Sequence, residues 1–139
     1  MTTNNSATVR RIFEAFSSGD KAVLNATIEK CYSPDFAHHG MGEEFSGRDG
    51  VKEMAGSYLT AFPDMKMAIE AQVESGDMVV TRLVASGTNS GEFDGKAPTG
   101  KAVRVSLISM ARFVDGKVAE EWEEGDLLGM MAQMGHLSA

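Results

Sequence analysis

Residues 103–125 read VRVSLISMARFVDGKVAEEWEEG, and this stretch decides the fold because it predicts two strands joined by a tight turn. Residues 103–113 place mostly apolar or small side chains at every second position, the period of a strand with one buried face. Asp115 and Gly116 form a strong hairpin signal, and the second strand extends to about Glu124. A sheet that buries one face must be covered by other elements.

The same two-residue period occurs upstream, in residues 65–73, directly after Pro63 ends a helical segment. Residues 75–77 form a turn, residues 78–90 return as the next strand, and residues 91–101 form a loop rich in Gly and Pro at the rim of a pocket. The side chains expected to face inward on the first of these strands are Met65, Met67, Ile69, Ala71 and Val73.

Helical spacing of apolar residues dominates the N-terminal part of the chain. A first helix is expected from Ala7 with Ser6 as its N-cap, and a second helix is capped by Asp20. Residues 47–62 predict a third helix, and residues 126–135 a short helix or turn. The side chains expected to face inward on the second helix are Val23, Leu24, Ala26, Thr27 and Ile28.

This order of elements predicts one α+β domain over residues 1–139, with three N-terminal helices covering about four main antiparallel strands. A strongly curved sheet covered by helices has the form of a cone, and we expect an internal apolar pocket in it. Pro34 opens a short extended piece, residues 36–40, between the second and third helices.

The charge balance excludes several classes of partner. The chain has 20 acidic and 13 basic residues, a formal net charge of −7, which argues against nucleic-acid and anionic-membrane binding. No apolar run approaches the roughly 18 residues of a membrane span, and no signal peptide is visible, so a cytoplasmic protein is expected. A single cysteine, Cys31, and three His residues argue against a disulfide or a metal site.

The quoted stretches that follow carry a resemblance to a known family. They are VRRIFEAFSSGD (residues 9–20), PDFAHHG (34–40), GRDGVKEM (47–54), AFPDMKM (61–67), GTNSGEFDGKAPTGKAV (87–103) and RFVDGKVAEEWEEGDLLGMMAQMG (112–135). In this order, over nearly the whole chain, they resemble the SnoaL-like polyketide cyclases, which have the nuclear transport factor 2-like fold.

The resemblance implies an α+β cone with a deep, mostly apolar pocket and chemistry without a metal or an organic cofactor. The characterised cyclases close a ring by intramolecular aldol condensation: a carboxylate takes the proton next to an ester carbonyl, and a His on the neighbouring strand assists. Matched through the turn at residues 115–117 and through Gly129, the carboxylate position falls on Glu123 and the His position on Ser109. Glu thus stands in place of Asp, and Ser in place of His.

Five carboxylates surround the only Trp of the chain, Trp122. In a regular strand Glu121 and Glu123 share one face and Glu120 lies on the other, although a one-residue bulge would exchange the faces. The family match places Glu123 in the pocket, where apolar surroundings raise the pKa of a carboxyl group and suit it to acid/base catalysis. Asp126 is the second candidate. The acids expected on a solvated face are Glu120, Glu121 and Glu124.

Two adjacent histidines, His38 and His39, compete for one place in the pocket. Neighbouring side chains of an extended segment point to opposite faces, so at most one of them enters it. The family often has a His at the position of His39, but its pocket residue on this segment aligns with His38. Both therefore stand as candidates to orient the substrate or to donate to a developing enolate oxygen.

The function expected is that of a cyclase or isomerase that acts on a hydrophobic, polyketide-like carbonyl compound, with Glu123 as general acid/base. The alternative is a non-catalytic module that binds a hydrophobic small molecule in the same cavity. Ser109 is expected to offer a hydrogen bond where the cyclases have His. The other expected substrate-binding side chains are Phe13, Phe16, Tyr58, Phe62, Met54 and Met67.

Further expectations concern the outer face of the sheet. Arg82 is expected to pair there with Glu70 or Glu120. An apolar patch around Trp122 predicts a homo-oligomer that forms through the sheets, a dimer or possibly a tetramer. The other residues of this patch are Ile108, Met110 and Val84.

Overall fold

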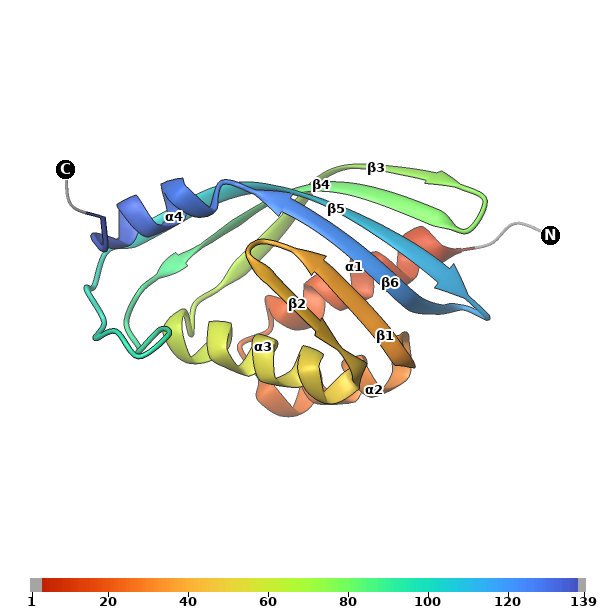
Figure 1. Cartoon of the computed structure of the whole chain (residues 1–139), viewed down its shortest axis with the longest axis horizontal. Helices are drawn as coiled ribbons and strands as arrows, with labels where there is room; N and C mark the ends of the chain where they lie inside the picture. Colours follow the sequence, from red (N-terminus) through yellow and green to blue (C-terminus); the bar gives the residue numbers. More distant parts are fainter. Residues whose placement is uncertain (1–3, 138–139) are drawn as a thin grey trace.

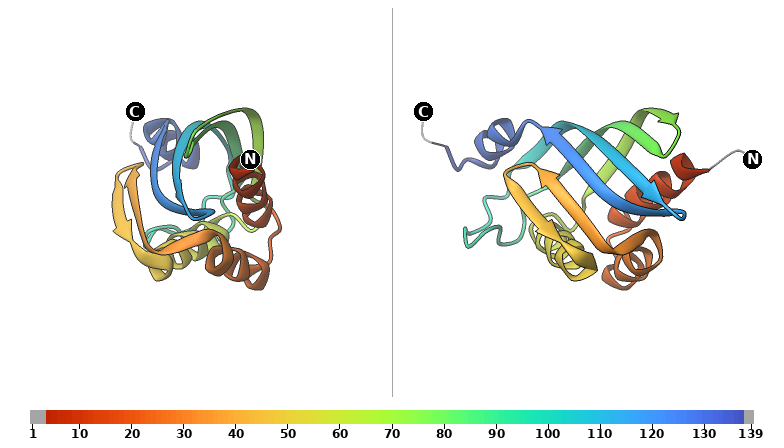
Figure 2. Two further views of the ribbon diagram at one scale, coloured as in Figure 1. Left: turned by 90° about the vertical axis from the view of Figure 1, so that its right-hand side faces the viewer. Right: turned by 45° about the vertical axis from the view of Figure 1, so that its right-hand side comes forward.

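The computed structural model describes residues 4–137 as four helices and a curved six-stranded sheet with the strand order β2-β1-β6-β5-β4-β3. The sheet wraps into an open half-barrel, and α1, α2 and α3 lie across its concave side (Figures 1 and 2). The helices are α1 (Asn5–Phe16), α2 (Lys21–Cys31), α3 (Gly47–Ala61) and α4 (Leu127–Met134). The strands are β1 (Tyr32–Gly40), β2 (Glu43–Ser46), β3 (Lys66–Ser75), β4 (Met78–Thr88), β5 (Ala102–Val114) and β6 (Lys117–Gly125).

The predicted α+β cone is confirmed, and the four strands expected after the third helix are β3 to β6. Two further strands, β1 and β2, form a hairpin that extends the sheet, with β1 pairing in parallel with β6. Only glycine fits at Gly40, where β1 pairs with β6. A Cβ there would lie 1.9 Å from the carbonyl oxygen of Glu123, and the φ of 114° also favours glycine. The sequence of β2 is short and polar, so it carried no strand signal.

The helix starts were predicted with mixed success. Asp20 caps α2 as expected, because its side chain accepts hydrogen bonds from the backbone of Ala22 and Val23. Ser6 is not an N-cap, since α1 begins at Asn5, two residues before its expected start at Ala7. The backbone and hydroxyl of Ser6 both donate to Glu74 of β3. That contact joins α1 to the sheet.

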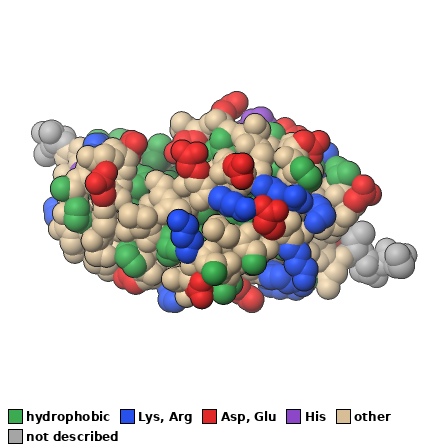
Figure 3. Space-filling view, turned by 90° about the horizontal axis from the view of Figure 1, so that it is seen from below, with side chains coloured by type: hydrophobic (Ala, Val, Ile, Leu, Met, Phe, Trp, Pro, Cys, Tyr) green, Lys and Arg blue, Asp and Glu red, His purple; other side chains and the backbone are tan. Residues whose placement is uncertain are grey.

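The inward face of α2 is narrower than expected. Leu24, Ile28 and Cys31 are buried, at positions i, i+4 and i+7, but Val23 is 45% exposed and Ala26 is exposed. The helix lies at the margin of the molecule and packs mainly against α1 and α3, so a single stripe of side chains reaches the core. Exposed ion pairs also join α2 to α3 here, within a helical face of mixed charge (Figure 3).

Two bulges change the side-chain pattern of the sheet. The register between β3 and β4 shifts between Ile69 and Ala71, so the expectation that Ala71 and Val73 face inward is wrong. Val73 is 65% exposed, whereas Gln72 turns inward and donates to Thr81 of β4. The extra residue of a bulge moves every following side chain to the other face.

The second bulge lies in β6, where the register with β5 shifts between Val118 and Glu120. Val118 is buried, and Glu121 and Glu123 further along the strand also face the concave side. The bulge therefore adds Val118 to the inner face without removing the two acids from it. This local irregularity brings a hydrophobic anchor and two carboxylates onto one face of a nine-residue strand.

The loop between β4 and β5 is held by the buried side chain of Asn89. Its amide nitrogen donates to the carbonyl of Gly91 at 2.9 Å, and its oxygen accepts from the backbone of Thr99 at 3.0 Å. Phe93 in this loop packs against Tyr58 and Phe62, with ring centroids 5.2 and 6.2 Å apart. The loop thereby lies against α3, but residues 91–101 are not among those that line the interior pocket.

Candidate active site

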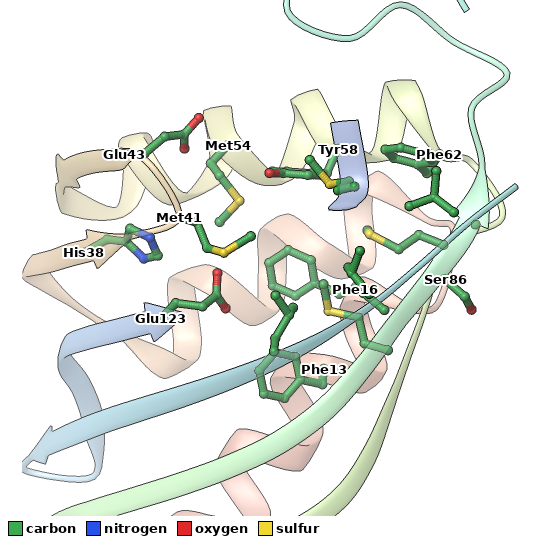
Figure 4. Close-up of a pocket in the computed structure, with 18 of the residues that line it drawn as sticks. Phe13, Phe16, His38, Met41, Glu43, Met54, Tyr58, Phe62, Ser86 and Glu123 are labelled. Carbon is green, nitrogen blue, oxygen red and sulfur yellow. The ribbon is translucent and has the colours of Figure 1, made fainter. Parts of the chain in front are cut away.

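A pocket of about 870 Å³, including its open mouth, lies between the concave face of the sheet and the helices. The lining is mostly apolar, as is common for cavities that bind small molecules. One end is mostly apolar and is formed by side chains of α1, α3, α4 and strands β3 to β5. The other end carries four polar side chains, from β1, β2 and β6, and Figure 4 shows three of them, His38, Glu43 and Glu123. The fourth is Glu121.

The apolar wall contains the side chains that the sequence predicted for substrate binding. They come from α1, from α3 and the residue after it, and from β3, because each of these elements turns an apolar face toward the sheet interior. Their role in binding stays a prediction. The six residues placed on the wall are Phe13, Phe16, Met54, Tyr58, Phe62 and Met67.

The polar end is built on a hydrogen-bonded chain across three strands. Nδ1 of His38 lies 3.2 Å from Oε1 of Glu121, and the hydroxyl of Ser109 donates to Oε2 of the same carboxylate at 3.0 Å. His38 is directly opposite Glu121 in the parallel β1–β6 pair. Although burial lowers it, the hydrogen bond to Glu121 and the nearby acidic charges raise the pKa of His38 above its ordinary value.

Glu123 lies two residues further along β6, opposite Gly40 of β1 and Ser109 of β5. Its carboxyl group points into the pocket beside Met41 (Figure 4), and no hydrogen bond joins it to another residue in the described part of the chain. Burial, together with the charge of Glu121, raises the pKa of Glu123 to about 8, although His38 opposes the shift. The site thus holds a carboxyl group that exchanges its proton near neutral pH.

Tyr58 of α3 brings a phenol hydroxyl to the pocket wall. Burial, together with the charges of Glu43 and Glu123, raises the pKa of Tyr58 to about 12. The phenol is therefore protonated throughout the neutral range and available as a donor. Figure 4 shows its oxygen on the side of the pocket that carries Met54 and Glu43.

The structure does not place His39 in the pocket. Its Nε2 lies 2.7 Å from Oε2 of Glu120 on the outer face of the sheet, and its ring stacks on Trp122 with centroids 5.7 Å apart. The reason is the alternation of side chains along β1, which sends His38 inward and its neighbour outward. His39 as a pocket residue is therefore corrected.

Two further candidates also lie outside the pocket wall. Asp126 is the N-cap of α4, where its carboxylate accepts from the backbone of Gly129 at 2.7 Å. Ser109 is 1% exposed, and its hydroxyl is engaged by Glu121 rather than offered to a ligand. The expected hydrogen bond from Ser109 to a substrate is therefore corrected to a hydrogen bond that supports Glu121.

Sequence reasoning missed Glu121 and Glu43 as site residues. Glu121 was expected on a solvated face, yet it is only 12% exposed; its equal parity with Glu123 was the signal that pointed inward. Glu43 was missed because β2 was. The turn at residues 40–42 reverses the chain and brings Glu43 to the pocket.

Several other expectations concern features outside the pocket. Arg82 pairs with Glu70 on the outer face, the first of its two expected partners. Among residues 4–137 no three His, Cys, Asp or Glu side chains are grouped as metal ligands. None of the helices in this described range is long and apolar enough to cross a membrane.

The sequence of this chain is similar to those of known proteins. Residues 7–134 match the family model described as SnoaL-like polyketide cyclase. Aklanonic acid methyl ester cyclase AcmA of Streptomyces galilaeus is 30% identical over 135 residues, which cover 93% of this chain and 89% of that protein.

Solved structures agree with this match over nearly the whole chain. IdmH of Streptomyces antibioticus, described as a putative polyketide cyclase, is 34% identical to this chain, with a TM-score of 0.77. The matched region covers 96% of this chain and 99% of the IdmH chain. AclR of Streptomyces galilaeus, described as a putative hydroxylase, is 30% identical to this chain, with a TM-score of 0.82. The matched region covers 97% of this chain and 83% of the AclR chain. The similar structures thus carry more than one proposed activity.

Proposed function

This chain belongs to the SnoaL-like polyketide cyclase family, and on that basis we propose that it closes a ring in a hydrophobic, polyketide-like carbonyl compound with Glu123 as general acid/base. The observation that carries the proposal is the carboxyl group of Glu123, which points into an apolar pocket without a hydrogen-bond partner among the described residues. No cofactor is invoked in this reaction.

The proposed reaction is an intramolecular aldol addition. Glu123 in its carboxylate form removes a proton from the carbon next to an ester carbonyl, and the C–H electron pair becomes an enolate. The enolate carbon then bonds to a second carbonyl carbon of the same molecule, whose oxygen becomes an alkoxide and takes a proton back. The pKa of about 8 makes the Glu123 carboxylate a stronger base than an ordinary Glu while keeping proton return accessible.

His38 and Tyr58 are the proposed donors to the developing oxyanion. The raised pKa of His38 increases its charged fraction near neutral pH, and the raised pKa of Tyr58 keeps its phenol protonated. Both side chains line the same pocket as Glu123. Donors fixed in a buried site stabilise negative charge in the transition state more than water does.

The chemistry of the lining also favours an uncharged substrate. Among the described residues that line the pocket there is no Lys or Arg, and three of them are glutamates. The relative AcmA is named for aklanonic acid methyl ester, in which the acid group is esterified. That ester is therefore the first substrate to test.

The decisive experiment compares Glu123→Gln with Glu124→Gln, its exposed neighbour on β6. Turnover of the ester is expected to fall about 10²- to 10⁴-fold in Glu123→Gln, because the amide cannot take a proton. Binding, measured by calorimetry, is retained since the two side chains have nearly the same shape, and Glu124→Gln behaves as the wild type. Near-normal turnover in Glu123→Gln overturns the proposal.

The second candidate is a non-catalytic module that holds a hydrophobic ligand, and Ser109 favours it. The residue at the family's His position neither titrates nor lines the pocket here. Tight binding of the ester by the wild type, with no change in the ester over hours, would select this function instead.

A further inference from the structure

Glu121 occupies the centre of the polar end without being part of the proposed proton transfer. Both of its oxygens are engaged, one by Nδ1 of His38 at 3.2 Å and the other by the hydroxyl of Ser109 at 3.0 Å. The three side chains come from β1, β6 and β5, which are neighbours in the sheet. A carboxylate fixed by both oxygens has little freedom to rotate.

The His38 ring is held on a second side by an aromatic neighbour. Phe45 of β2 stacks on it with ring centroids 4.4 Å apart and planes within 7°. A carboxylate only accepts hydrogen bonds, so the bond to Glu121 requires the proton on Nδ1. Nε2 is then the nitrogen left to exchange a proton or a hydrogen bond with other groups.

We propose that Glu121 is a positioning residue, which Ser109 anchors and which fixes the tautomer and orientation of His38 while holding a negative charge beside Glu123. In this arrangement β1 supplies the imidazole of the site, and Ser109, at the family's His position, supports the carboxylate that orients it. The catalytic part of this inference rests on the proposed function, but the geometric part does not.

The charges around Glu123 and His38 determine how the removal of Glu121 changes the pKa values of these two groups. The charged side chains that act on Glu123 are Glu121, His38 and Glu43, and its own charge acts on the buried phenols of Tyr32 and Tyr58. The titratable side chains that act on His38 are Glu121 and Glu123. The Glu121 charge raises the pKa of both Glu123 and His38. Its removal is therefore expected to lower both values together, which a purely structural residue would not do.

The experiment is Glu121→Gln, with Glu120→Gln on the outer face of the same strand as the matched control. Carbon-13 NMR of the Glu123 carboxyl and nitrogen-15 NMR of His38 are followed through pH in the ligand-free protein. In Glu121→Gln both titrations are expected to move to lower pH, and the Nδ1–H tautomer of neutral His38 to lose its dominance. In Glu120→Gln both titrations are expected to stay in place.

Activity supplies the second readout. The kcat of Glu121→Gln is expected to fall about 10- to 100-fold, the range known for carboxylates that orient metal-bound histidines, with KM nearly unchanged. The pH profile of kcat in this variant should shift to lower pH, as the titration of Glu123 does. Ser109→Ala, which keeps Glu121 and frees one oxygen, is expected to weaken the tautomer preference less and serves if Glu121→Gln does not fold.

The outcomes separate the two proposals. Unchanged His38 tautomer and Glu123 titration in a folded Glu121→Gln or Ser109→Ala protein overturn the positioning role, even if Glu123→Gln abolishes turnover. A wild type inactive on the ester, with both titrations moving as expected, removes the proposed reaction and leaves the positioning role standing.

Discussion

Two His–Glu pairs lie on opposite faces of the β1–β6 strand pair, made by consecutive residues on each strand. His38 and Glu121 face the pocket at 3.2 Å, whereas His39 and Glu120 face outward at 2.7 Å. The outer pair has the shorter contact, yet only the inner pair adjoins the candidate site. Burial and neighbouring groups, rather than the length of the contact, therefore decide what a His–Glu pair can do.

The outer pair stabilises its own charges at the surface. Its hydrogen bond lowers the pKa of Glu120 and raises that of His39, and Arg112 also bonds to Glu120. Side-chain exposures of 32% and 25% leave both groups in contact with water, which screens their effect on other residues. The inner pair is 4% and 12% exposed, so its charge acts on Glu123 through a poorly screened interior.

The largest effect that separates the two pairs is expected from exchanging each His for Asn. His38→Asn should lower turnover of the ester about 10²-fold or more, because the donor and its orienting bond are lost. His39→Asn should stay within about twofold of the wild type, since the ring lies on the outer face. Steady-state kinetics of the two variants checks this, and equal losses would break the contrast between the faces.

A large effect is also expected on the pH dependence of stability. The pKa of Glu123 is about 8 in the folded protein against an ordinary value of 4.5. The free energy of unfolding is therefore highest below pH 4.5 as far as this group is concerned, and it falls as pH rises toward 8. Glu123→Gln should remove a decline of about 2–4 kcal/mol over this range.

Urea unfolding at a series of pH values measures this decline. Glu124→Gln is the matched control and should keep the wild-type slope, because that residue is exposed. A parallel pH dependence in the wild type and Glu123→Gln would show that the carboxyl ionises as easily in the folded chain as in the unfolded one. The acid/base role would then lose its electrostatic basis.

The smallest effect on the site is expected from the outer face itself. We propose that two copies of the chain associate through this face, where Ile108 is 51% and Met110 36% exposed beside Trp122. Val84, also expected in this patch, is buried and does not contribute to it. Trp122→Glu should convert the dimer to a monomer in gel filtration while turnover per chain changes little. A monomeric wild type would refute the association without touching the inner pair.

Much of the scaffold followed from local patterns in the sequence. The Asp115-Gly116 hairpin and the alternation of β5 are found in the structure where they were expected, as is the Asp20 cap. Apolar spacing on α1 and α3 also identified wall residues such as Phe13 and Tyr58. These features depend on neighbours within a few residues, which a sequence displays directly.

The sequence therefore determined by itself the α+β class, the main helices and hairpins, the apolar wall and, through the family resemblance, the position of Glu123. Only the tertiary structure decided that His38 rather than His39 faces inward, that Glu121 is a buried member of the site, and that bulges turn Val73 out and Val118 in. These outcomes depend on pairing between β1 and β6, which lie far apart in the chain, and on single extra residues that reverse a strand's faces. Such contacts are set by the packing of the whole molecule, and no local pattern of side chains specifies them.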